Sequence, residues 1–268
     1  PRKVSIKFSH SNKIPFILNP WTGEIDQAAQ YKSNKDYIKL DLFFESYGSI
    51  IIEFKEAKEK LHILESPLRA ERIDGDIVSY SDNSGEYLIK LSDGTKKDIN
   101  IKIAQFSSLI LTNWHLKTNL RDYLGNLSSI EMNLEELKDW CNMPELKYCS
   151  SKGIYTSKFI LDDNYFQENL KLILSLGLVH DVAIVKVNNV QYQPLLVYPY
   201  EIDITPQVKS GENNIEIEII PTLRNRLNGY GKVGGKNWRN FKRRKIFMPS
   251  GLIGPVTIKP RYAINIKS

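Results

Sequence analysis

Apolar and polar residues alternate along much of the chain, a period of two that is typical of β-strands with one buried face. Residues 215–219 show it most clearly, since three isoleucines alternate there with two glutamates. Residues 38–42 and 170–174 follow a similar pattern, and residues 49–54 form an almost continuous apolar run, which favours a strand covered on both faces. Turn-forming pairs separate these runs, at Tyr47-Gly48, Asp74-Gly75, Asp93-Gly94, Asn188-Asn189 and Ser210-Gly211. Short strands with such turns predict an all-β chain built of sandwiches.

Helical patterns are scarce in this sequence. Residues 132–137 could form one or two helical turns, with Ser128 or Ser129 as the N-cap. Strands and helices do not alternate along the chain, which excludes a Rossmann fold and a (β/α)8 barrel, and no glycine-rich phosphate loop is present. We therefore expect two closely packed β-sandwich modules, residues 1–105 and residues 106–268.

Basic residues gather at one end of the 268-residue chain. Residues 219–268 hold twelve lysines and arginines and no acidic residue, while the first 218 residues carry 25 basic and 31 acidic groups. A basic end on an acidic body indicates a local anionic partner rather than a uniformly cationic protein. No apolar run approaches the length of about eighteen residues that a membrane-spanning helix needs. No secretory signal is visible, and a start at Pro1 suggests a processed or excised segment.

The sequence predicts no cofactor, and its metal-ligand candidates are weak. Four histidines are spread along the chain, at His10, His62, His115 and His180. Their spacing fits no metal site. Asp162 and Asp163, followed by Asn164, are candidate ligands for a structural calcium ion, although such a run is commoner as a plain turn. Cys141 and Cys149 could form one bridge, but two half-buried free thiols are the preferred interpretation.

Several segments of the second half follow one another in a recognisable order: 137–140, 146–155, 182–190, 200–205, 208–217, 223–229 and 248–256. The last two contain Asn225-Arg226-Leu227 and Pro249-Ser250-Gly251-Leu252-Ile253-Gly254-Pro255-Val256. In this order the chain is similar to the sugar-binding jelly-roll domain of family 2 glycoside hydrolases. It more closely resembles the C-terminal β-sandwich of family 106 α-L-rhamnosidase-like glycoside hydrolases. Residues 19–24 and 40–54 also resemble the β-rich segment that precedes this sandwich.

The resemblance implies a galactose-binding-like jelly roll for the second module and a parent enzyme that acts on plant or host glycans. The catalytic barrel of such enzymes has no counterpart here, so no catalytic residue is carried over. Asn189 also departs from the family, which usually has glycine there, a change that a hairpin turn can absorb. We therefore expect a non-catalytic ancillary portion of a glycoside hydrolase, extracellular or periplasmic. Its partner would be a carbohydrate or the parent's catalytic domain, and neither nucleic acid nor a membrane.

Candidate sugar-binding residues fall in the basic, glycine-rich stretch near the C-terminus. Trp238 and Tyr230 could present aromatic rings to a sugar, and the accompanying cations are Arg224, Arg226 and Arg239. The alternative function is a free-standing adhesion or glycan-binding module that holds an acidic polysaccharide through residues 224–245. The same basic run also fits a solvated loop or an interdomain contact.

Other aromatic and acidic residues have a structural interpretation. Trp114 and Trp140 are expected to cap the core, because tryptophan buries a large area. Residues 249–256 are expected to form a turn that delivers the last strand. A glycosidase needs two carboxyl groups facing one sugar ring. The sequence pairs none of its candidates, which read as turn residues or solvated charges: Asp139, Asp162, Asp163, Glu201 and Asp203.

Overall fold

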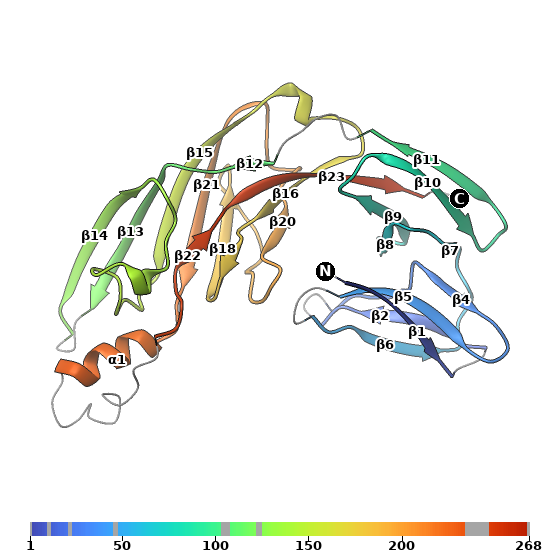
Figure 1. Cartoon of the computed structure of the whole chain (residues 1–268), viewed down its shortest axis with the longest axis horizontal. Helices are drawn as coiled ribbons and strands as arrows, with labels where there is room; N and C mark the ends of the chain where they lie inside the picture. Colours follow the sequence, from blue (N-terminus) through green and yellow to red (C-terminus); the bar gives the residue numbers. More distant parts are fainter. Residues whose placement is uncertain are drawn as a thin grey trace. The chain divides into compact units, whose positions relative to one another are not determined.

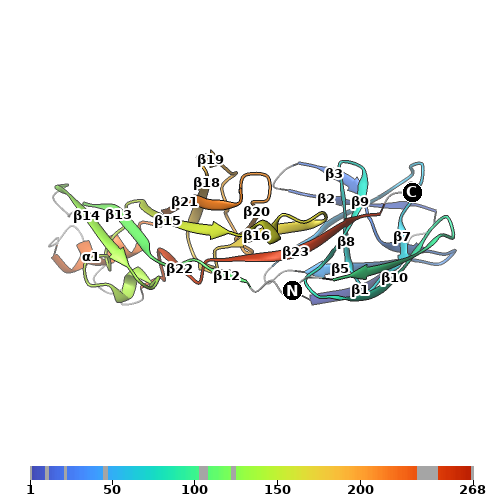
Figure 2. The same cartoon turned by 90° about the horizontal axis from the view of Figure 1, so that it is seen from above.

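The computed structural model describes residues 2–9, 12–20, 23–44, 48–102, 108–121, 125–233 and 247–266. These residues form antiparallel sheets with one α-helix and two short 3-10 helices (Figures 1 and 2), so the prediction of an all-β chain is confirmed. The chain divides into two compact units. The N-terminal unit comprises Pro1–Phe106, Glu168–Lys171 and Pro260–Ser268, and the C-terminal unit comprises Ser107–Gln167 and Leu172–Lys259.

The first part of the N-terminal unit contains two three-stranded sheets. One has the order β1 (Arg2–Phe8), β5 (Ile38–Phe44) and β4 (Tyr31–Ser33), and the other has the order β3 (Ile25–Gln27), β2 (Ile14–Leu18) and β6 (Ile51–Lys55). On β5, the alternation of the sequence places Ile38, Leu40 and Leu42 in a core with Tyr31 and Ala28. The residues from 38 to 42 thus form the strand that their pattern predicts.

The second part of the N-terminal unit has a core of its own. Its strands are β7 (Ile63–Glu65), β8 (Arg69–Ile73), β9 (Asp76–Ser81), β10 (Gly85–Leu91), β11 (Lys96–Ile101) and the end of β23 (Thr257–Asn265). Residues 262–265 of β23 pair with β9. Ile266 is buried in the same apolar cluster as Ile63, Ile77 and Ile89, so the last described residue completes a core whose other buried members lie between Ala29 and Ile101.

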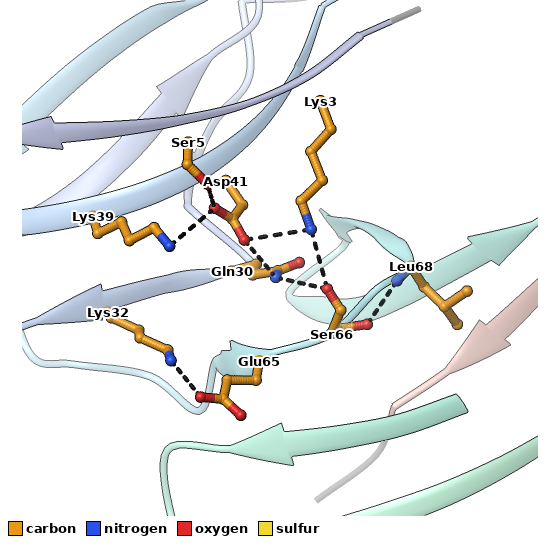
Figure 3. Close-up of polar contacts among 9 residues, drawn as sticks. All are labelled: Lys3, Ser5, Gln30, Lys32, Lys39, Asp41, Glu65, Ser66 and Leu68. Carbon is orange, nitrogen blue, oxygen red and sulfur yellow. Dashed lines mark hydrogen bonds and ion pairs between the residues drawn. The ribbon is translucent and has the colours of Figure 1, made fainter. Parts of the chain in front are cut away.

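Polar side chains connect the two parts of the N-terminal unit (Figure 3). Asp41 accepts a hydrogen bond from the Ser5 hydroxyl and lies 3.4 Å from the Lys3 ammonium. Lys3 Nζ and Gln30 Nε2 both donate to the Ser66 carbonyl oxygen, each at 3.2 Å. Partial burial by itself would raise the pKa of Asp41, but the Ser5 hydrogen bond and the nearby lysines lower it below its usual value. This cluster is a satisfied structural network apart from Gln30 Oε1, which is buried without a hydrogen-bond partner among the described residues.

The C-terminal unit is a sandwich around the largest core of the described chain. One layer is a six-stranded sheet in the order β14 (Leu127–Leu134), β13 (Trp114–Arg121), β15 (Gly153–Leu161), β21 (Gly211–Ile220), β18 (Val182–Val187) and β19 (Val190–Gln191). The strands opposite it are β12 (Leu109–Ile110), β16 (Leu170–Ser175), β17 (Leu178–Val179), β20 (Glu201–Asp203), β22 (Leu252–Gly254) and the start of β23. Trp114 and Trp140 are both buried in this core, as predicted.

Several local predictions are confirmed in this unit. Asn188 and Asn189 have φ values of 49° and 70°, the left-handed conformation that the turn between β18 and β19 requires. The two cysteines are free thiols. In the turn before β22 (Leu252–Gly254), Gly251 has a φ of 84°, and a Cβ atom there would lie 2.6 Å from the Trp140 ring. Glycine is therefore required at position 251, both for its φ and for the space that it leaves.

Two local predictions are wrong. Residues 132–137 form no helix, because β14 continues to Leu134 and pairs with β13 along its whole length. Ile130, Met132 and Leu134 then pack on the core with a period of two, so pairing with a neighbouring strand overrides the local helical preference. Conversely, the stretch expected as a glycine-rich loop begins as the helix α1 (Arg224–Val233). Gly229 lies inside α1 against the Tyr148 ring, where a Cβ atom would be only 2.8 Å from that ring.

Candidate functional site

The outward face of the six-stranded sheet carries rows of polar side chains. On β21, Ile215, Ile217 and Ile219 are buried, and Glu216 and Glu218 point to the opposite face. The strand register then places six polar residues side by side across the sheet, in the order Asn133, His115, Thr156, Glu216, Lys186 and Gln191. The alternation in the sequence predicts the polar face but not which residues become neighbours.

Lysines on this face are paired with glutamates. Lys186 Nζ lies 2.7 Å from Glu216, and this hydrogen bond raises the pKa of Lys186 above its usual value. The other pairs are Lys117–Glu131 at 2.6 Å, Lys158–Glu212 at 2.9 Å and Lys152–Glu218 at 3.1 Å. The hydrogen bond from Lys117 lowers the pKa of Glu131 in the same way. Each of these four lysines is therefore balanced by a glutamate.

A hollow of about 540 Å³ opens on this face, and we call it the sheet hollow. Its lining consists of Asn113, Thr156, Ser157, Lys158, Lys186, Asn189, Asn214, Ile215 and Glu216. These residues come from β15, β18 and β21 and from the turns before β13 and after β18. The volume falls in the range of roughly 300–1,000 Å³ that small-molecule sites occupy.

A second candidate surface lies at α1, close to the ends of β13 and β14 (Figure 1). We call it the α1 surface and define it by Arg226, Tyr230, Lys232, Lys147, Tyr148 and Phe247. Lys232 Nζ donates to Tyr148 Oη at 2.9 Å, and Lys147 Nζ lies 4.9 Å from the centre of the Phe247 ring. Arg226 Nε donates to Tyr230 Oη, and the guanidinium lies 5.1 Å from the centre of the Tyr230 ring. Within the described ranges, none of the three cations forms an ion pair with a carboxylate.

Buried polar residues hold α1 and the turn before β22 in place. Asn225 exchanges two hydrogen bonds with the Met248 backbone, from Met248 N to Oδ1 at 2.9 Å and from Nδ2 to Met248 O at 2.7 Å. Asp181 Oδ2 accepts hydrogen bonds from Ser250 Oγ at 2.8 Å and from Gly251 N at 3.0 Å. The segments 223–229 and 248–256, which carry the family resemblance, are thus bound to each other. Sequence reasoning missed the roles of Asn225 and Asp181, because a polar residue beside a turn gives no sign of its burial.

The structure brings some of the predicted sugar-binding residues together. Arg226 and Tyr230 contact each other on α1, and Tyr230 Oη donates to the Arg121 carbonyl oxygen at 3.3 Å. The Nε atom of Arg224 is buried without a hydrogen-bond partner in the described part of the chain. Trp238 and Arg239 lie outside the described residues.

The acidic candidates take local roles. Asp162 precedes the 3-10 helix η2 (Asp163–Tyr165), and the described residues contain no group of three or more histidine, cysteine, aspartate or glutamate side chains that could hold a metal ion. Asp139 Oδ1 accepts hydrogen bonds from the backbone nitrogens of Cys141 and Ser250, and it caps the 3-10 helix η1 (Trp140–Asn142). Across the described chain, no helix is long and apolar enough to cross a membrane.

Comparison with known proteins relates the chain to glycoside hydrolases. No protein-family model matches it. A putative beta-glucuronidase of Formosa agariphila is 28% identical over 159 aligned residues, which cover 48% of this chain and 14% of that protein. The structure of a rhamnosidase from Novosphingobium sp. PP1Y matches 97% of this chain and 21% of that chain, with a TM-score of 0.63 and 22% identity. A beta-glucuronidase of an uncultured Clostridium sp. matches 46% of this chain with a TM-score of 0.31 and 19% identity.

The matches to the rhamnosidase and to the putative beta-glucuronidase define the class of fold. The chain is a β-sandwich protein with a fold related to that of glycoside hydrolases, and nearly all of it has the fold of one region of a rhamnosidase. It spans about a fifth of the length of that rhamnosidase and about a seventh of the length of the putative beta-glucuronidase.

Proposed function

We propose that the chain is a non-catalytic ancillary portion of an α-L-rhamnosidase-like glycoside hydrolase of family 106. In this proposal, the C-terminal unit, which lies within residues 106–268, is a galactose-binding-like jelly roll that binds carbohydrate. The N-terminal unit, formed mainly by residues 1–105, is the module that precedes it. The observation that carries it is the match of 97% of the chain to only 21% of a rhamnosidase. A match of this kind is expected when both units are accessory parts of a longer enzyme.

The chemistry of the polar face supports a role in binding rather than in catalysis. Glu216 and Glu218 share one face of β21, two positions and so about 7 Å apart along the strand. That spacing suits a pair of glycosidase carboxyls, but one of them must then be a protonated acid. Each glutamate is instead bound to a lysine, Glu218 to Lys152 and Glu216 to Lys186. Both side chains are therefore engaged in ion pairs within the sheet, as expected for a polar surface rather than for a catalytic pair.

The proposal also covers the binding partners of the protein and its location. Its partners are a glycan or the catalytic domain of the parent enzyme, and its location is extracellular or periplasmic, as for secreted enzymes that digest polysaccharides. We expect neither nucleic acid nor a membrane as a partner.

Two measurements test the proposal on the 268-residue chain. The first is hydrolysis of 4-nitrophenyl α-L-rhamnopyranoside and 4-nitrophenyl β-D-glucuronide, and we expect no release above that of a heat-denatured sample. The second is affinity electrophoresis through gels that contain plant polysaccharides, where we expect retardation by at least one glycan. Turnover at an enzyme-like rate would contradict the non-catalytic role, and mobility that no polysaccharide changes would contradict carbohydrate binding.

A second candidate function is binding of an acidic polysaccharide at the α1 surface. Its unpaired cations Arg226, Lys232 and Lys147 favour it, because cations without carboxylate partners attract an anionic chain. Aromatic rings next to all three cations hold their side chains in place and so reduce the entropy lost on binding. Calorimetric titration with polygalacturonate at low and high salt tests this function. Binding that weakens as salt increases supports it, and absent or salt-insensitive binding contradicts it.

A further inference from the structure

We infer that the sheet hollow is a subsite for an uncharged pyranose, which it recognises through hydrogen bonds to neighbouring hydroxyl groups. This inference rests on the proposed carbohydrate-binding function and assigns it to a place distinct from the α1 surface. The hollow belongs wholly to the C-terminal unit.

Polar groups with no internal partner converge on this hollow. Asn113, Thr156, Asn189 and Asn214 all line it, and within the described ranges none of their side chains forms a hydrogen bond or ion pair. Amides offer both donors and acceptors, and a hydroxyl offers one donor and two lone pairs. A pyranose presents the same mixture around its ring. Three amides and a hydroxyl around one hollow are therefore complementary to a polyhydroxylated ligand.

The charge balance of the hollow selects against an anionic sugar. Lys158 and Lys186, the cations of the lining, are each bound to a glutamate, Glu212 and Glu216. A carboxylate on the ligand would lie beside the negative charge of one of these glutamates and be repelled by it. An uncharged sugar meets no such cost. Its hydroxyls can accept from Lys186 and donate to Glu216 while that pair stays intact.

The rim of the hollow is fixed before any ligand binds. Asn188, the neighbour of Asn189, donates through Nδ2 to the Gln207 carbonyl oxygen at 2.7 Å and to Asn213 Oδ1 at 2.8 Å. The Asn214 backbone nitrogen donates in turn to Asn188 Oδ1 at 2.9 Å. Asn213 is fully buried, so the turn is tied to the core. A rim held in this way loses little conformational freedom on binding.

Among the described residues, the lining contains no aromatic ring, so hydrogen bonding rather than stacking determines both orientation and affinity. We therefore expect weak binding of a single sugar unit and a strong dependence on individual polar side chains. Removing one neutral hydrogen-bonding group should lower the affinity about tenfold.

The test uses two ligands and three variants of the 268-residue chain. Methyl β-D-galactopyranoside and methyl β-D-galactopyranosiduronate differ only in whether C6 is a hydroxymethyl or a carboxylate group. Each is titrated into the protein at low and high salt, with binding followed by chemical-shift changes of the backbone amides. The variants Thr156→Val and Asn214→Leu remove polar groups from the hollow. Asn119→Leu is the matched control, because Asn119 is an exposed asparagine on β13 of the same sheet and does not line the hollow.

We expect the neutral galactoside to bind independently of salt and to shift the amides of residues 156, 186 and 214. Thr156→Val and Asn214→Leu should each weaken it about tenfold, and Asn119→Leu should change it less than twofold. Galactoside binding that survives both hollow variants would overturn this inference and leave the proposed carbohydrate binding intact. A preference for the uronate that salt abolishes would also overturn it and would favour the α1 surface. If neither these ligands nor any polysaccharide binds, the inference and the proposed function both fail.

Discussion

The sheet hollow and the α1 surface belong to the same unit but are built in opposite ways. Side chains of the hollow are placed by strand register, and its lysines are neutralised by glutamates on neighbouring positions. Side chains of the α1 surface come from α1, which buried polar groups hold to the segment around Met248, and from Lys147, Tyr148 and Phe247 outside the helix. Among the described residues, its cations contact aromatic rings instead of carboxylates. The comparison teaches that a lysine count alone does not predict the ligand. The local partner of each lysine decides whether its charge is available.

The largest expected effect comes from Asp181, which supports the α1 side of the unit. The variant Asp181→Ala removes the buried acceptor of Ser250 Oγ, Gly251 N and Thr222 N. We expect the free energy of unfolding to fall by about 3–5 kcal/mol, because two buried donors, Ser250 Oγ and Gly251 N, lose their partner. Urea unfolding followed by tryptophan fluorescence measures this change. A loss below about 1 kcal/mol would mean that water replaces the carboxylate without cost.

A smaller loss of stability is expected for a variant that should affect the α1 surface but not the sheet hollow. Asn225→Ala leaves the Met248 backbone nitrogen without its partner and removes one of the two donors to the Met248 oxygen, which keeps the Cys141 thiol. We therefore expect a loss of about 1–2 kcal/mol in the free energy of unfolding. Because Asn225 anchors α1 and not the sheet, binding of polygalacturonate should weaken while binding of the neutral galactoside stays unchanged. Equal losses for both ligands, measured by calorimetry at a temperature where the variant is folded, would mean that the two surfaces are not independent.

The lysines themselves provide the next comparison. Lys147→Met and Lys232→Met should each weaken polygalacturonate binding about three- to fivefold at low salt, since an exposed charge contributes roughly 0.5–1 kcal/mol. Lys158→Met is the matched control on the polar face, because the charge of Lys158 is already compensated by Glu212. We expect less than a twofold change for it. A control that loses as much as the α1 variants would show that net charge matters and local pairing does not.

The last prediction leaves stability and binding unchanged and concerns the Cys141 thiol, which accepts a hydrogen bond from Asn225 of α1. Burial, followed by the nearby Asp139 carboxylate, raises the pKa of Cys141 to about 11. Only the thiolate reacts with iodoacetamide, so labelling at pH 8 should be roughly a hundredfold slower in the folded protein than in urea. The rate should rise about tenfold per pH unit until it levels off near that pKa. Cys149→Ala isolates the signal of Cys141, and a rate that levels off near pH 9 would contradict the raised pKa.

Sequence alone predicts the strands of this chain better than its surfaces. The alternation at 38–42 and 215–219 reflects burial of one face, a physical cause that acts residue by residue, and the structure confirms both strands. The helix predicted at 132–137 is wrong because the local sequence favours a helix, whereas pairing of β14 with β13 depends on residues that lie outside this segment. The sheet hollow could not be predicted, since Asn113, Thr156, Asn189 and Asn214 lie far apart in sequence and each is an ordinary surface residue. The basic stretch is visible in composition, but Trp238 and Arg239 fall outside the described residues.

Strand β23 has a consequence for the order in which the chain can fold. Its last residues pair with β9, and Ile266 fills the apolar cluster around Ile63 and Ile89. During synthesis, the first hundred residues leave the ribosome long before position 266 is made. The N-terminal unit must therefore wait, with one edge of β9 open, until the C-terminal unit has been translated. An unpaired strand edge of this kind can pair with other chains. Pairing of β23 with β9 therefore protects the nascent protein from aggregation.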